Sequence, residues 1–117
     1  MNRSGAGREG EEKAAAALEK SGMSIIARNV RFKTGEIDLV ALDGDKMVFV
    51  EVKSWTAYGF EELRFGIDKK KQRRIIETAK FFLAAHREYN CMAVRFDVVF
   101  IGPETVTHLI SAFMEQE

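Results

Sequence analysis

Three carboxylates and one lysine recur at β-strand spacing in two nearby stretches of the sequence, first Glu36 and Asp38 and then Glu51 and Lys53. Alternate residues of a strand point to the same face of a sheet, so the members of each pair share a face. Residues 43–46, with the sequence Asp-Gly-Asp-Lys, are a strong hairpin signal between the two stretches. We therefore expect the two strands to pair and their carboxylates to gather on one face.

The turn is compatible with two registers. If residues 44–45 form the loop, Asp38 lies directly opposite Glu51. If residues 43–44 form it, Glu36 faces Glu51 instead. Opposed carboxylates repel each other across a strand pair, so either register calls for a nearby cation. The lysine of the second stretch is one candidate, and a bound metal ion is the other.

The available side chains favour a hard metal ion. They supply carboxylate oxygens, whereas the two histidines, His86 and His108, lie elsewhere in the sequence. Oxygen ligands suit Mg²⁺ or Mn²⁺. Such an ion lowers the pKa of bound water and neutralises charge on a phosphate, while Lys53 could stabilise charge that develops there. The simpler alternative is a cross-strand set of salt bridges at strand ends in water.

A basic run opens the long helix that the sequence predicts after the hairpin: Lys69, Lys70, Lys71, Arg73 and Arg74. The helix dipole disfavours cations at this end, so the run suggests a surface for phosphates with salt-sensitive affinity for nucleic acid. The alternative is an ordinary solvated helix face. Aromatic residues of the preceding loop, Trp55 among them, could stack on bases or could pack against one another.

The elements that must position these residues alternate between helix and strand. Both faces of the central hairpin are largely apolar beyond its charged end, so we expect helices on both faces of a mixed sheet in an α/β domain. Residues 1–9 are expected to be a flexible lead, and 10–117 a single domain. The predicted elements are a helix at 10–20, strands at 23–32, 36–42 and 47–52, a loop at 54–66, a helix at 68–88, strands at 93–101 and 105–109, and a short helix or frayed end at 110–117.

Two polar residues head the apolar stripes of the predicted helices. Glu11 is in line with Ala14, Ala15 and Leu18, and Gln72 is in line with Ile75, Ile76, Ala79, Leu83 and His86. A buried stripe is an unusual place for a carboxylate that lacks a partner. The alternatives are a first-turn glutamate favoured by the helix dipole and an ordinary boundary glutamine.

Composition narrows the class of protein. The 117 residues suit one domain, with 46% hydrophobic and 31% charged residues and a formal net charge of zero, so any affinity for nucleic acid must come from a local patch. The single cysteine, Cys91, excludes an internal disulfide, and its apolar neighbours predict an inert core residue. No apolar run is long enough to span a bilayer, and residues 1–10 contain no hydrophobic segment, so we expect a cytoplasmic protein without membrane contact.

The order of these motifs resembles the PD-(D/E)XK nuclease superfamily, and within it the YraN-like family of predicted bacterial endonucleases. The resemblance extends over nearly the whole chain, and a more distant likeness links it to archaeal Holliday-junction resolvases. It implies a restriction-endonuclease-like fold. The motifs that carry the resemblance are Gly10-Glu11, Arg28-Asn29, residues 35–40, residues 49–53, Lys71-Gln72 and residues 95–99.

The resemblance also implies roles for individual residues. Asp38 and Glu51 would bind the metal ion, with the carbonyl of Val52 as a third ligand. Lys53 would be the catalytic lysine, and Glu11 an accessory acidic residue.

Three further positions complete the comparison. Gln72 corresponds to a residue that orients the site. Glu36 is shared within the YraN-like family, but it is not a general ligand of the superfamily. Trp55 stands where the family usually has an arginine, so phosphate binding there would need another group or stacking.

We therefore predict a metal-dependent endonuclease that hydrolyses phosphodiester bonds in DNA, with branched DNA as one candidate substrate. The alternatives are a nucleic-acid-binding module that does not cleave, and a structural partner in a DNA repair or uptake complex. The sequence leaves the metal, the substrate's shape, the protein partners and the formation of a homodimer open.

Overall fold

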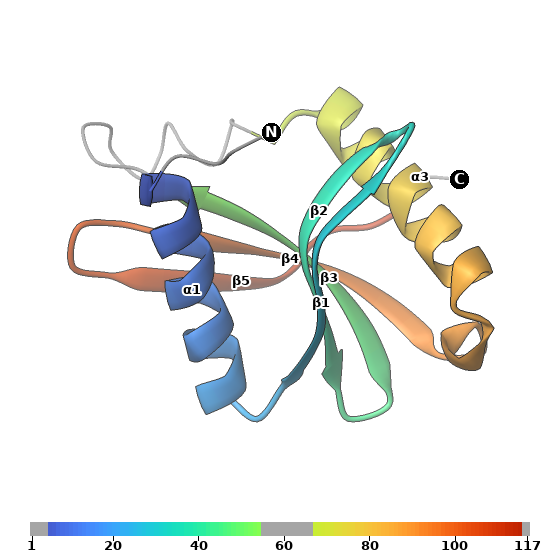
Figure 1. Cartoon of the computed structure of the whole chain (residues 1–117), viewed down its shortest axis with the longest axis horizontal. Coiled ribbons are helices and arrows are strands. Elements are labelled where there is room, and N and C mark those ends of the chain that lie inside the picture. Colours follow the sequence, from blue (N-terminus) through green and yellow to red (C-terminus); the bar gives the residue numbers. More distant parts are fainter. Residues whose placement is uncertain (1–4, 55–66, 116–117) are drawn as a thin grey trace.

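The computed structural model describes residues 5–54 and 67–115, and this part of the chain forms a five-stranded sheet with helices on its two faces (Figure 1). The strand order is β1-β2-β3-β4-β5, and every neighbouring pair is antiparallel except β3–β4, which is parallel. None of the described helices is both long enough and apolar enough to cross a membrane. The elements are α1 (Gly5–Lys20), β1 (Ser24–Phe32), β2 (Gly35–Asp43), β3 (Lys46–Ser54), α3 (Lys69–Ala85), a 3₁₀ turn (Arg87–Tyr89), β4 (Ala93–Ile101) and β5 (Val106–Phe113).

Helix α1 is favoured by its run of four alanines and is ended by a glycine. Gly22 has φ +103, and its N–H donates to the carbonyl of Glu19, while the N–H of Met23 donates to the carbonyl of Leu18. This pair of hydrogen bonds is a Schellman motif, which needs a residue that tolerates positive φ. The buried side chains of Leu18 and Met23 then belong to the same core cluster.

Helix α3 begins where the sequence predicts. Asp68 is its N-cap and accepts a hydrogen bond from the N–H of Lys71 at 2.8 Å. The helix ends at Ala85, a few residues before the predicted end, because the chain tightens there into the 3₁₀ turn. The predicted apolar stripe is confirmed at Ile75, Ile76 and Ala79, which are all buried.

The sheet separates two layers of apolar side chains. On one face, α1 covers a cluster that includes Leu39, Val50 and Val99. On the other face, α3 covers a cluster built around Phe49, whose ring lies 5.9 Å from that of Phe82. Apolar residues therefore alternate between two covered faces along β2 and β3, as the sequence predicts for a sheet that lies between helices.

The central hairpin adopts the first of the two predicted registers. Asp43 pairs with Lys46, so residues 44–45 form the loop, and Gly44 has φ +61 as the first position of a type II′ turn requires. Pairing between β2 and β3 continues to Leu39 and Val50 and ends there. Beyond this point, β2 remains paired with β1, and β3 remains paired with β4. The two central strands therefore part at the predicted carboxylates.

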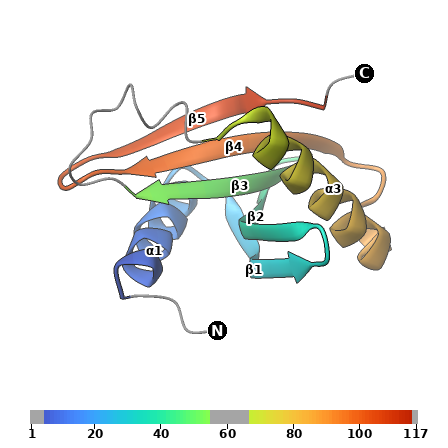
Figure 2. The same ribbon diagram turned by 90° about the horizontal axis from the view of Figure 1, so that it is seen from above.

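The free end of the β1–β2 hairpin bends away from β3 toward α3 (Figure 2). Asn29 has φ +53 on β1, and Ile37 packs in the α3-side cluster, whereas Leu39 packs in the α1-side cluster. Regular alternation predicts the same face for Ile37 and Leu39, so that prediction is wrong because the strand bends between them. The hydroxyls of Thr34 and Thr78 lie 2.7 Å apart and join the hairpin turn to α3.

Three other predictions differ from the structure. Helix α1 begins at Gly5 instead of residue 10, so it includes the second half of the predicted lead. Strand β5 continues to Phe113, where the sequence predicts a short helix or a frayed end. It continues because the N–H of Ser111, in a bulge with φ +53, donates to the buried carboxylate of Asp97. Cys91 is exposed in the turn before β4 and is not part of the core.

Candidate functional site

A cavity of about 600 Å³ opens where β2 and β3 part, with the first turns of α3 as its other wall. Four of the residues predicted at the site from the two strand motifs line it, together with the backbone and side chain of Val52. Basic residues of β1 and α3 complete the wall. The lining residues are Arg31, Gly35, Glu36, Asp38, Glu51, Val52, Lys53, Asp68, Lys70, Lys71, Arg74 and Ile75.

Asp38 occupies the point where the strands separate. Continuing the register from Leu39 and Val50 would pair Val52 with residue 37, but this pairing is absent from the ladder. Instead, the N–H of Val52 donates to the Asp38 carboxylate at 2.8 Å. The side chain of Asp38 thus accepts from a backbone N–H of β3 at a point where β2 is no longer paired with it. The same hydrogen bond holds the carboxylate close to the backbone that follows Glu51.

Glu51 is a buried carboxylate beside a second carboxylate. Only 6% of the residue is exposed. Burial raises the pKa of Glu51, and the charge of Asp38 and a hydrogen bond with it raise the pKa further. An ion pair with Lys71 offsets part of this, and the net result is a pKa of about 7. At neutral pH this glutamate is therefore divided between its charged and its protonated form.

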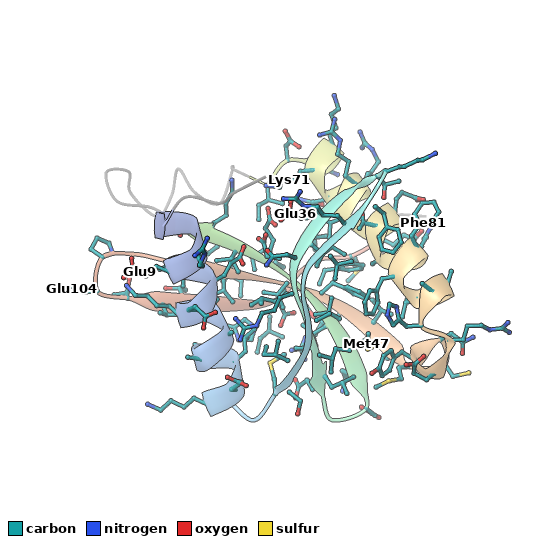
Figure 3. The ribbon with its side chains drawn as sticks, viewed as in Figure 1. Glu9, Glu36, Met47, Lys71, Phe81 and Glu104 are labelled. Atoms are coloured by element: carbon teal, nitrogen blue, oxygen red, sulfur yellow. The ribbon has the colours of Figure 1, made fainter. Side chains whose placement is uncertain are left out.

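The other two charged residues of the strand motifs, Lys53 and Glu36, line the same cavity. Lys53 lines it from β3, two residues beyond Glu51. Glu36 forms an ion pair with Arg31 at 3.2 Å across the β1–β2 hairpin. Figure 3 shows Lys71 and Glu36 in the region between the start of α3 and the start of β2, where the cavity lies.

Two of the residues with predicted catalytic roles lie outside the cavity. Glu11 is buried on α1, which covers the other face of the sheet. Its neighbour Gly10 packs so closely on β3 that an added Cβ would lie 2.5 Å from the hydroxyl oxygen of Ser54. Gln72 donates to the carbonyl of Ile67 at 3.1 Å and lines a different, smaller cavity. Its neighbour in sequence, Lys71, is the α3 residue that reaches the carboxylates.

The basic run of α3 is divided between two sides of the helix. Lys70, Lys71 and Arg74 line the cavity that holds the carboxylates, whereas Lys69 and Arg73 line the smaller cavity that also contains Gln72. The predicted stacking residue, Trp55, lies outside the described residues.

Sequence reasoning missed Arg31 and the ion pair between Lys71 and Glu51. Residues 33–34 form a second two-residue loop, which pairs Arg31 with Glu36. Recognising that loop in the sequence would have indicated the position of Arg31. The ion pair depends on which side of the apolar stripe of α3 lies next to the carboxylates, and helical periodicity alone does not specify this side.

A second buried acidic site was also missed. Asp97 on β4 is fully buried, yet it accepts hydrogen bonds from Arg95, His108 and the N–H of Ser111. Burial alone would raise the pKa of Asp97, but these hydrogen bonds outweigh it and lower the pKa. Arg95 also pairs with Asp43 at 2.8 Å, so the network joins β4, β5 and the central hairpin.

The carboxylate pair offers limited but suitable ligands for a hard cation. Among residues 5–54 and 67–115, no three side chains of His, Cys, Asp or Glu gather closely enough to hold a metal ion. Asp38 and Glu51 are the side chains that could hold a cation here, with the carbonyl of Val52 as the third ligand that the resemblance implies and water or substrate oxygens completing the shell. Mg²⁺ is commonly bound in this way, through one or two carboxylates and substrate phosphates.

Comparisons with known proteins place the chain in a family. Residues 10–101 match the profile described as "Uncharacterised protein family UPF0102". A UPF0102 protein of Treponema pallidum (strain Nichols) is 45% identical over 111 residues, which is 89% of this chain and 88% of the relative. One from Persephonella marina is 44% identical over 109 residues, with 92% and 91% covered, and one from Caldicellulosiruptor saccharolyticus is 42% identical over 99 residues, with 85% and 83% covered. Because the match includes both strand motifs, the start of α3 and the whole of β4, the chain that builds this cavity belongs to the UPF0102 family.

Proposed function

We propose that this protein is a divalent-cation-dependent endonuclease that hydrolyses phosphodiester bonds in DNA, on a restriction-endonuclease-like fold. The observation that carries the proposal is the position of Asp38 and Glu51, which meet where two strands part inside a cavity lined by basic side chains. A mixed sheet between helices is compatible with that fold.

The donor set supports Mg²⁺ or Mn²⁺ as the cation. Asp38, Glu51 and the carbonyl of Val52 would hold it, since they present oxygens from adjacent positions of two strands. When bound, such a cation would activate a water molecule and neutralise charge on the phosphate. The protein's own contribution is to fix the carboxylates, Asp38 through its hydrogen bond to Val52 and Glu51 through burial.

Lys53 is the residue we propose to act on the phosphate itself. It shares the cavity with the carboxylates and carries a positive charge that could stabilise the charge developing on the phosphate oxygens. Arg31, Lys70 and Arg74 lie farther along the same wall and would hold neighbouring phosphates. Glu11 and Gln72 would act indirectly, because neither residue lines this cavity.

The test is cleavage of a panel of linear, nicked, flapped and four-way DNAs with Mg²⁺, with Mn²⁺ and with a chelator. Asp38→Asn is the matched variant, because its amide oxygen can still accept from the N–H of Val52 while the charge is lost. We expect cation-dependent cleavage by the wild type and none by the variant. Lys53→Ala should reduce the cleavage rate while DNA affinity stays nearly unchanged.

A nucleic-acid-binding module without cleavage is the second candidate. It is favoured by the basic wall of the cavity, which could hold phosphates whether or not a cation is present. DNA binding by the folded wild type, with no cleavage of any substrate under any cation, would select this candidate. Failure to bind any nucleic acid would refute both proposals and favour a structural role in a larger complex.

A further inference from the structure

Lys71 reaches across the cavity from α3 and forms a close ion pair with Glu51. The two ends of this contact differ in exposure. The side chain of Glu51 is only 7% exposed, whereas that of Lys71 is 41% exposed. The ammonium group therefore reaches a buried carboxylate from the solvent side, through the same cavity that a cation or a phosphate would enter.

The ammonium group and a divalent cation compete for the same oxygens. Glu51 cannot keep a close ion pair with Lys71 and also present that oxygen to a metal ion, because two cations at such separation repel strongly. Of the two, Lys71 is the easier to move. Its backbone is fixed by the Asp68 cap and by the burial of Ile75, but a lysine side chain is long and flexible enough to turn into solvent.

We propose that Lys71 is a built-in counter-cation that pairs with Glu51 in the metal-free protein and must be displaced before a divalent cation binds between Glu51 and Asp38. This inference rests on the cation site of the proposed function. The contact holds Glu51 in place and raises the cation concentration at which the site fills. Once released, the ammonium group remains on the cavity wall beside Lys70 and Arg74, where a phosphate group would attract it.

The test measures Mn²⁺ binding by isothermal titration calorimetry on protein treated with a chelator, without DNA and without any assay of activity. Lys71→Met keeps the length of the side chain and removes its charge. Lys70→Met is the matched control, since it removes the same charge from the adjacent position on the same wall. Lys71→Arg keeps the charge. Circular dichroism checks that each variant is folded, and Lys71→Gln provides a second neutral variant.

We expect Lys71→Met to bind Mn²⁺ about tenfold more tightly than the wild type, corresponding to ~1.4 kcal/mol. Lys70→Met should tighten binding clearly less, and Lys71→Arg should remain close to the wild type. If Lys70→Met and Lys71→Met tightened Mn²⁺ binding equally, the change in net charge would explain the effect, and the inference would be overturned. Unchanged or weaker binding in Lys71→Met would also overturn it. If neither the wild type nor any variant binds Mn²⁺, the cation site itself is refuted.

Discussion

Replacing Glu51 with glutamine should change how the stability of the metal-free protein depends on pH. In the folded protein, burial and the neighbouring carboxylate of Asp38 raise the pKa of Glu51 from 4.5 to about 7. Between these two values, the folded protein binds more protons at this site than the unfolded chain does. The free energy of unfolding therefore falls as the pH rises through this window. The glutamine side chain of Glu51→Gln cannot titrate, so the free energy of unfolding of this variant does not fall in this window on account of residue 51.

The size of the effect follows from the pKa values. One pKa unit corresponds to about 1.4 kcal/mol at 25 °C, so a change from 4.5 to about 7 corresponds to about 3 kcal/mol. We expect the stability of Glu51→Gln relative to the wild type to rise by roughly this amount between pH 4.5 and pH 8. This amount already includes the ion pair with Lys71, which lowers the pKa of Glu51 and is lost in the variant.

The assay is urea denaturation at a series of pH values in the presence of a chelator, with the two proteins compared at each pH. Asp45→Asn is the control, because it removes a carboxylate from the exposed hairpin turn and leaves the buried carboxylates in place. A flat difference between Glu51→Gln and the wild type from pH 4.5 to pH 8 would refute the reasoning. It would mean that neither burial nor the carboxylate of Asp38 disfavours the charged form of Glu51 in solution.

Three further perturbations test other parts of the structure. Asp97→Asn should lower the free energy of unfolding by about 3 kcal/mol at pH 7. This loss should shrink as the pH falls below 3.8, since the pKa of Asp97 is lowered and its contribution disappears when it is protonated. Thr78→Val keeps the volume but removes the contact with Thr34, and urea denaturation should show a loss of about 1 kcal/mol. Replacing Lys70 and Arg74 with alanine should lower the slope of log DNA affinity against log salt by about two units, and an unchanged slope would locate the DNA surface elsewhere.

Local signals in the sequence predicted the helices, strands and turns more reliably than the way in which these elements lie against one another. The turn residues at 43–46 predicted the hairpin, although they left two registers open, and Asp68 marks the start of α3, because each feature depends on a few adjacent residues. The parting of the strands at Asp38 could not be predicted in this way. It depends on the bend of the β1–β2 hairpin and on the contact of its turn with α3, which joins residues far apart in the sequence.

The same dependence on distant residues explains why the sequence did not show which of two residues at the start of α3 faces the carboxylates. Lys71 and Gln72 are adjacent, so a rotation of the helix by about 100° would bring Gln72 to the direction in which Lys71 points. The burial of Ile75, Ile76 and Ala79 against the sheet determines that rotation. Helical periodicity predicted this stripe correctly, but it could not show which neighbour of the stripe faces the carboxylates.

A comparison of two buried acidic residues, Asp97 and Glu51, shows why the carboxylate pair is better explained by function than by stability. Asp97 is surrounded by donors from three residues, and its pKa is lowered, as expected for a carboxylate that stabilises the fold. Glu51 is also buried, yet a second carboxylate lies beside it, its pKa is raised, and a cavity opens in front of it. A fold able to satisfy Asp97 so fully has no structural need for such a destabilising pair. Perturbed carboxylates in a cavity are typical of sites that bind or react, and they are the part of this protein to test first.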